Sequence, residues 1–352
     1  MCFAGSMSRE PGPVERVDHL AIRAEDAVQR LVGGGLRRAG WVPRVVAHVG
    51  YGLEGAWVRV LGRVVLVPED SLAARHPEDA RGWRRFVTQS AAGVPVTIEV
   101  GGVRTRVESD REGYLDVRLP ADLPPGWATA QLAVEGHDGP ETTAQLQVVA
   151  ADARHGLVSD IDDTVMITML PRPLVAFRNA FVTREVDRLP VPGMAGLYRD
   201  LLAHRPDTFV VYLSTGAWNV AGAIGRFLAR HDYPPGPALL TDWGPTPRGW
   251  FRSGQRHKTT GLRRLVEDFP QLRWVLVGDD GQHDPEIYAE AAAQPPHRAE
   301  AGLIRRLRPG AQDARYGPPA PRAQAAGPGA ATGYGDDGDE LRAEAQRLGL
   351  LG

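Results

Sequence analysis

Three carboxylates in one short segment are the first feature of this sequence that could do chemistry. Asp160, Asp162 and Asp163 follow the apolar run Leu157 to Ser159, a pattern typical of a buried parallel strand. Open α/β sheets bind their ligands at the carboxyl ends of strands. Crowded like charges persist where a cation holds them, or where one group must stay protonated to act as an acid. A bound metal ion is therefore the simplest explanation.

Two structural alternatives compete with a catalytic metal site at this motif. A calcium-binding EF-hand loop requires Gly at its sixth position and Glu at its twelfth. Counted from Asp160, these positions hold Val165 and Pro171, so an EF-hand is excluded. An ordinary Asp-rich turn stays open when this motif is considered alone, because Asp is common in turns.

Two further features could bind a phosphoryl group. The apolar strand predicted at Val210 to Leu213 ends in Ser214 and Thr215, where hydroxyls and backbone amides could hold phosphoryl oxygens. A simple turn or helix cap is the alternative for Ser214. Lys258 stands just before a helix predicted at Thr259 to Phe269, and its ammonium could offset the charge of a phosphate and a nucleophile.

A second acidic group follows another predicted strand. Asp279, Asp280 and Asp284 come after the apolar run Trp274 to Gly278. Mg²⁺ suits such a site, since it is bound by a few carboxylates together with water and substrate phosphate. Lys258 is also the one lysine among 41 basic residues. A compact ammonium can occupy a place that the planar guanidinium of arginine does not fit.

The elements that must position these residues fall into two patterns. An amphipathic helix is expected at Val17 to Arg38, and β-type runs separated by Gly, Pro and Asp follow as far as Val149. After Leu157 short apolar strands alternate with helical patterns. The predicted fold class is therefore α/β: a doubly wound parallel sheet preceded by a β-sandwich-like N-terminal domain with an N-terminal helix. The expected divisions are a helical segment 1–40, a β-rich domain 41–150, an α/β domain 151–308 and a tail 309–352, disordered except for a short helix.

Composition excludes several classes of protein. The chain has 352 residues and a formal net charge of -2, which argues against a role based on nucleic-acid attraction. Its single cysteine, Cys2, excludes an intrachain disulfide and a multi-thiolate zinc site. Every apolar run is too short to span a membrane, and the N-terminal residues lack the pattern of a signal peptide. We expect a cytoplasmic protein, with peripheral contact at the inner membrane surface as a further expectation.

The four features together resemble the haloacid dehalogenase superfamily of aspartate-nucleophile phosphatases. Within it, the segment from about Ser159 to Tyr288 is similar to the catalytic domain of the actin-patch phosphatidate phosphatases and their bacterial relatives. The resemblance rests on Ser159 to Thr164 (SDIDDT), Arg178-Asn179, Pro190 to Met194 (PVPGM), Lys258, Val277 to Gln282 (VGDDGQ) and Asp284 to Tyr288 (DPEIY). It implies a haloacid-dehalogenase-like phosphatase domain at 151–308.

The resemblance also implies a role for each matching residue. Asp160 attacks phosphorus and forms an aspartyl phosphate, and Asp162 acts as the acid and then the base. Ser214 and Lys258 bind the phosphoryl group. The residues that hold Mg²⁺ are expected to be Asp160, Asp162 through its backbone carbonyl, Asp279 and Asp284; those expected to bind substrate are Thr215, Arg178 and Asn179.

Two departures from the family pattern bear on the substrate. Gly216 stands where a second serine is usual, and Asp280 stands where a serine is common. The segment Leu170 to Phe181 combines apolar residues with Arg and could rest at a lipid surface; a lid helix is an equal alternative. We expect a magnesium-dependent phosphatase of phosphatidate or a related lipid phosphate. A phosphatase of a soluble phosphomonoester and a non-catalytic partner-binding or membrane-binding protein are the alternatives. No nucleic-acid partner is expected.

Overall fold

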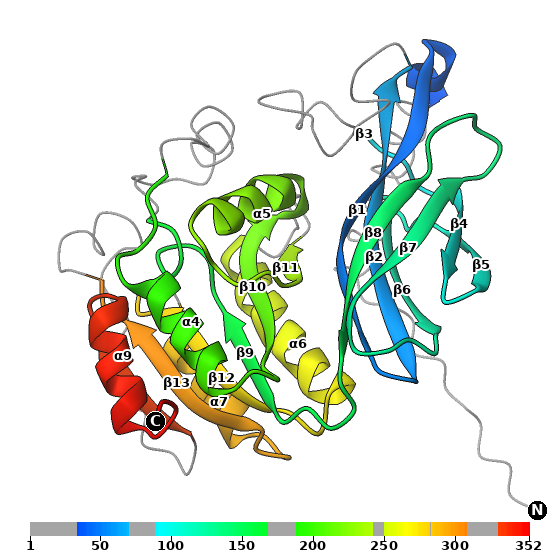
Figure 1. The fold of residues 1–352 in the computed structure, drawn as a ribbon. Coiled ribbons are helices and arrows are strands. Elements are labelled where there is room, and N and C mark those ends of the chain that lie inside the picture. The colour runs from blue at the N-terminus through cyan, green and yellow to red at the C-terminus, as the bar shows by residue number, and fades with distance from the viewer. Residues whose placement is uncertain (1–33, 70–88, 168–187, 242–249, 282, 308–329) are drawn as a thin grey trace, which may run out of the picture.

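Two β-sheets organise the protein (Figure 1). The computed structural model describes residues 34–69, 89–167, 188–241, 250–281, 283–307 and 330–352. We call the sheet formed by β1 to β8 the mixed sheet and the sheet formed by β9 to β14 the parallel sheet.

The mixed sheet has eight strands in the order β3-β2-β1-β8-β7-β4-β5, with β6 paired to β2 beside β3. All its pairs are antiparallel except β1 with β8. The sheet curls round a core of its own that includes Val60, Ile98 and Leu146. Its strands are β1 (Trp41–Leu53), β2 (Trp57–Pro68), β3 (Gln89–Ser90), β4 (Pro95–Val100), β5 (Val103–Glu108), β6 (Tyr114–Pro120), β7 (Gly126–Val134) and β8 (Thr142–Val149).

The parallel sheet has six strands in the order β11-β10-β9-β12-β13-β14, with every neighbouring pair parallel. Its central strands are almost wholly buried, as expected for strands that are covered on both faces. The strands are β9 (His155–Ser159), β10 (Phe209–Ala217), β11 (Ala238–Thr241), β12 (Arg273–Asp279), β13 (Ala299–Arg305) and β14 (Ala331–Gly335).

Helices cover both faces of the parallel sheet. On one face α4 (Met194–His204), α5 (Ala221–Arg230) and α9 (Gly338–Arg347) pack into a shared apolar core. On the other face α6 (Trp250–Asp268) and α7 (Asp284–Ala293) pack into a second apolar core. This second core also contains Tyr51 and Trp57 of the mixed sheet. The short 3-10 helix η4 (Trp218–Val220) joins β10 to α5. The mixed sheet therefore packs against the parallel-sheet unit beside α6 (Figure 1).

The fold class predicted from the sequence is wrong. The N-terminal strands form one curled mixed sheet and not a sandwich of two sheets. Alternation of apolar and polar residues predicts which side of a strand faces the core, but it does not determine which strands share hydrogen bonds. Most of the helix expected at Val17 to Arg38, and the insertion expected between Pro68 and Thr88, lie outside the described residues.

The end of the chain also differs from the expected tail. Residues Ala331–Gly335 form β14, the sixth strand of the parallel sheet, and α9 follows where the short helix was expected. Leu341, Ala345 and Leu350 are buried in the core beside α4. These residues are part of the fold because pairing with β13 and burial of α9 supply the stability that the local sequence lacks. Among the described helices, none is both long and apolar enough to cross a bilayer.

Candidate active site

The segment after β9 is held at the carboxyl edge of the parallel sheet. The Asp160 backbone N–H donates to the Val277 carbonyl of β12 at 2.8 Å, and Asp163 N–H donates to the Met166 carbonyl at 2.8 Å. Asp163 has a φ of 60°, a left-handed conformation that Asp tolerates better than most residues. This tight turn places the side chains of Asp160 and Asp162 in buried positions.

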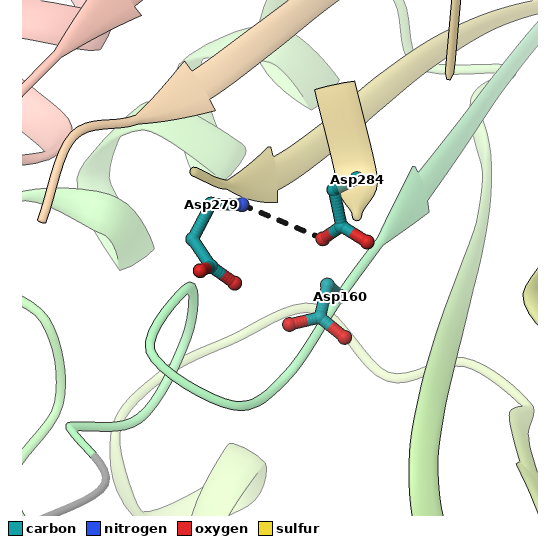
Figure 2. Close-up of side chains that lie close together, drawn as sticks. All are labelled: Asp160, Asp279 and Asp284. Carbon is teal, nitrogen blue, oxygen red and sulfur yellow. Dashed lines mark hydrogen bonds between the residues drawn. The ribbon is translucent and has the colours of Figure 1, made fainter. Parts of the chain in front are cut away.

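Asp160, Asp279 and Asp284 form an acidic cluster in which one oxygen from each lies within 4.8 Å of the others (Figure 2). Asp160 follows β9, Asp279 ends β12, and Asp284 begins α7. All three are at most 1% exposed. Gly278 allows this approach, since a Cβ atom there would meet Asp284 Oδ2 at 2.5 Å. The strand order thus brings together residues that are 124 positions apart at the extremes.

Lys258 of α6 is the cation that faces the acidic cluster. Its Nζ lies 2.8 Å from Asp160 Oδ1 and 2.5 Å from Asp284 Oδ1. Burial by itself would lower the pKa of Lys258, but the charges of Asp160, Asp284 and Asp279 raise it above its ordinary value. The ammonium is therefore charged at neutral pH and neutralises part of the cluster.

One ammonium does not balance the cluster. Burial, together with the charges of Asp284 and Asp162, raises the pKa of Asp160 to about 8 against the effect of Lys258. Burial and the same kind of repulsion raise the pKa of Asp279 well above its ordinary value. Within the described residues Asp160 Oδ2 and Asp279 Oδ2 are buried without a hydrogen-bond partner. Hard oxygen donors of this kind fit Mg²⁺.

Asp162 and Ser214 meet beside the acidic cluster. Ser214 Oγ donates to Asp162 Oδ2 at 3.2 Å and accepts from the Gly216 backbone N–H at 2.9 Å. Burial raises the pKa of the Asp162 carboxyl group. The charge of Arg188 opposes this effect without cancelling it, so the pKa lies above its ordinary value. A carboxyl group with a raised pKa is suited to proton transfer. Gly216, which lacks the usual second hydroxyl, contributes its backbone N–H here.

The other predicted site residues lie in different surroundings. The Thr215 carbonyl accepts from Thr241 Oγ1 at 2.8 Å, and its side chain packs near Gly254 at the beginning of α6. Arg178 and Asn179 fall outside the described residues. Asp280 accepts from the Leu307 backbone N–H at 2.8 Å and is not a member of the acidic cluster.

Neither histidine near the site belongs to the cluster. His257 lies next to Lys258 in α6, and burial lowers its pKa to about 4. His283 precedes α7 and is exposed. This arrangement is consistent with oxygen donors being the ligands of the proposed cation.

Arg305 is a residue near the site that the sequence analysis missed. Its Nη1 donates to the Asp163 carbonyl at 2.6 Å, and its Nε donates to the Asp336 carbonyl at 3.0 Å. It therefore links the turn after β9 to the segment between β14 and α9. Its position at the carboxyl end of β13 is the signal that could have indicated it, but residues Ala299–Arg305 carry no strand pattern that was recognised.

Part of this chain is similar to known proteins. Residues 155–306 match the family described as phosphatidate phosphatase APP1, catalytic domain. The chain is 28% identical over 201 residues to phosphatidate phosphatase APP1 of Saccharomyces cerevisiae, which covers 56% of this chain and 34% of that protein. It is 23% identical over 150 residues to an uncharacterized protein of Schizosaccharomyces pombe, covering 42% of this chain and 24% of that protein.

These matches confirm the resemblance to the APP1 catalytic domain that the sequence predicted. The chain spans about a third or less of the length of these curated relatives. Among solved structures, a carbohydrate acetylesterase from Xanthomonas citri is similar at 12% identity with a TM-score of 0.27, over 76% of this chain and 68% of that chain. At that TM-score the likeness says nothing about the fold or the function of this chain.

Proposed function

We propose that this protein is a magnesium-dependent phosphatase that acts through an aspartyl-phosphate intermediate on phosphatidate or a related lipid phosphate. The observation that carries the proposal is the buried Lys258 ammonium between Asp160 and Asp284, beside carboxylate oxygens of Asp160 and Asp279 that have no partner in the described part of the chain. The match of residues 155–306 to the APP1 catalytic domain supports the same reaction class.

The proposed reaction begins with attack of the Asp160 carboxylate on phosphorus. The bond between phosphorus and the leaving alkoxide oxygen breaks, and Asp162 gives its proton to that oxygen. Asp162, now a carboxylate, removes a proton from water, and the resulting hydroxide attacks the phosphorus of the aspartyl phosphate. Inorganic phosphate leaves, Asp160 regains its carboxylate, and Asp162 regains its proton.

The remaining residues position the phosphoryl group and offset its charge. Ser214 Oγ lies 3.2 Å from Asp162 Oδ2 and accepts from the Gly216 backbone N–H; its hydroxyl would donate to a phosphoryl oxygen. Lys258 would hold the phosphoryl group close to Asp160. Asp160, the Asp162 carbonyl, Asp279 and Asp284 would hold Mg²⁺, which supplies positive charge where the phosphoryl oxygens become more negative.

Substitution of the proposed nucleophile tests the reaction class. Asp160→Asn keeps the size of the side chain and removes the attacking carboxylate, so turnover of p-nitrophenyl phosphate with Mg²⁺ should fall by a factor on the order of 10⁴ or more. Asp280→Asn is the matched control, because its amide oxygen can still accept from Leu307 N–H and its activity should stay close to wild type. Activity that survives in Asp160→Asn would exclude this mechanism.

A second assay tests the substrate class. Phosphatidate in mixed detergent micelles should be hydrolysed with a higher kcat/KM than glycerol 3-phosphate or a nucleoside monophosphate. Such a substrate requires only peripheral contact with a membrane, on the cytoplasmic side in our proposal. Efficient hydrolysis of soluble esters with none of phosphatidate would instead identify a soluble-substrate phosphatase.

A further inference from the structure

The mixed sheet contacts two elements of the candidate active site. One is η4, which begins at Trp218, four residues after Ser214. The His48 ring of β1 stacks on Trp218 with ring centroids 4.5 Å apart and planes at 29°, and Tyr114 of β6 lies 6.2 Å from the same ring. Trp218 also packs against both apolar cores of the parallel sheet. The segment that carries Ser214 is therefore followed by Trp218, whose side chain packs against His48 and Tyr114 of the mixed sheet.

The other element is α6, the helix that carries Lys258. Asp268 at the end of α6 is buried and accepts from Tyr51 Oη at 3.1 Å, Arg59 Nη2 at 3.3 Å and Arg118 Nη1 at 3.1 Å. All three donors come from the mixed sheet. Lys258 and Asp268 are ten residues apart, about 15 Å along the helix, so the anchored end fixes the axial position of Lys258.

A second ion pair strengthens this contact. Arg264 Nη1 of α6 lies 2.7 Å from Asp116 Oδ2 of β6, and Asp116 Oδ1 also accepts from Arg59 Nη1 at 2.7 Å. Together with Asp268, these groups form a connected charge network between α6 and two strands of the mixed sheet. Networks hold geometry better than isolated surface pairs, since several bonds must break together.

The acidic cluster is held in a different way. Asp160 and Asp279 are fixed by the pairing of β9 with β12, and Asp284 by α7. β9, β12 and α7 all belong to the parallel sheet and the helices that cover it. The stacking and charged contacts of the mixed sheet thus reach the elements of Ser214 and Lys258, which are proposed to bind phosphate. The proposed metal ligands are placed first by strand pairing and by α7, and Lys258 pairs with two of them.

We infer that the mixed sheet is a positioning part of the phosphate-binding half of the active site, with His48 and Asp268 as its positioning residues. This inference rests on the proposed function. His48 acts as a neutral aromatic ring: burial, reinforced by Arg63, lowers its pKa to about 3, and its Nε2 has no hydrogen-bond partner among the described residues. A phenyl ring can therefore replace its stacking role.

The test compares four variants by their binding of inorganic phosphate in saturating Mg²⁺ and of Mg²⁺ alone, both by titration calorimetry. His48→Ala and Asp268→Asn should each weaken phosphate binding on the order of tenfold, since small displacements of positioned groups are costly. The Mg²⁺ affinity should change clearly less than the phosphate affinity, because strand pairing and α7 hold the carboxylates and Lys258 only offsets part of their charge. His48→Phe should restore phosphate binding.

The control in the mixed sheet is Arg106→Met, which removes the exposed 2.9 Å ion pair with Glu135, a residue that takes part in neither contact, and should change neither affinity. Unchanged phosphate binding in both His48→Ala and Asp268→Asn, or equal loss of phosphate and Mg²⁺ binding, would overturn the inference. If one variant does not fold, the other and His48→Phe still decide the question. Wild-type turnover is measured separately, so failure of the proposed function is distinguished from failure of the positioning role.

Discussion

Charge balance is the main feature of the site at the scale of single residues. Lys258 contacts Asp160 and Asp284, while Asp279 adds a third buried carboxyl group. Removing one partner from a buried ion pair is costly, because the other charge then lacks compensation. The site therefore depends on its lysine for stability as well as for the proposed binding of phosphate.

Lys258→Met should expose this dependence. In EDTA the free energy of unfolding should fall by about 3 kcal/mol, and Mg²⁺ should restore a part of it by neutralising the same carboxylates. Urea unfolding with and without Mg²⁺ measures both effects. Arg104→Met, which removes an exposed ion pair with Glu99, should leave the free energy of unfolding close to that of wild type, because solvent screens such pairs. Equal stability of Lys258→Met and wild type would contradict the assigned charge balance.

His48 should make stability depend on pH. Its pKa is lowered from 6.5 to about 3 in the folded protein, so between these values the unfolded chain binds a proton that the folded chain does not. Stability is therefore lost as the pH falls below 6.5, by up to about 1.4 kcal/mol per pH unit. The free energy of unfolding of wild type, relative to that of His48→Phe, should fall by about 2 kcal/mol between pH 7 and pH 5. A constant difference in urea unfolding would show that His48 is not buried in its neutral form.

At the scale of elements, the sequence predicted the strands whose carboxyl ends carry the candidate site residues. It did not predict β13 and β14, which complete the parallel sheet. The apolar runs near Leu157, Phe209 and Trp274 are present as β9, β10 and β12. β14 (ATGYG) has a single large apolar residue, so its own sequence carries no strand pattern. It forms a strand because β13 supplies hydrogen bonds and α9 covers it.

The candidate site was predictable to the same degree. Acidic residues at strand ends were visible as a pattern, and the structure places Asp160, Asp279 and Asp284 together; their roles stay a prediction. Contacts such as Arg305 with the Asp163 carbonyl, or His48 with Trp218, join positions more than 100 residues apart. Such pairs have no local signature, because only the packing of whole elements brings them together.

Close packing of α9 against the beginning of α4 gives a test of the C-terminal elements. A Cβ atom at Gly338 would meet the backbone carbon of Gly193 at 2.1 Å, so Gly338→Ala must separate the two helices. We expect a loss of about 1–3 kcal/mol in the free energy of unfolding. Gly225→Ala in α5 is the matched control: its Cβ would meet nothing within 4 Å, and it should be neutral or stabilise by up to about 1 kcal/mol. An equally stable Gly338→Ala would show that α9 is not docked as described.

At the scale of the whole molecule, the two sheets share an apolar core. Tyr51 and Trp57 of the mixed sheet pack on Phe269, with ring centroids 5.7 and 5.4 Å away, and Phe209 of β10 lies 5.0 Å from Phe269. The division between a domain 41–150 and a domain 151–308 stays a prediction. A shared core of this kind favours joint unfolding of the two sheets.

Phe269→Ala should therefore destabilise both sheets together. Removal of this buried ring should cost about 3–5 kcal/mol, and the two sheets should still unfold in a single transition. Calorimetry combined with hydrogen exchange checks this, with Leu132→Ala in the separate core of the mixed sheet for comparison. Two separate transitions in the wild type would show that the sheets unfold independently.

The arginine-rich character of the chain gives its lone lysine a practical value. Apart from the α-amino group, Lys258 is the single amine that an N-hydroxysuccinimide ester can acylate in all 352 residues. Its side chain is 2% exposed and held by two carboxylates, so the reagent reaches it when this part of the protein opens. The rate of labelling, followed by mass spectrometry of the intact chain, therefore measures how often the protein opens enough to expose Lys258 to solvent.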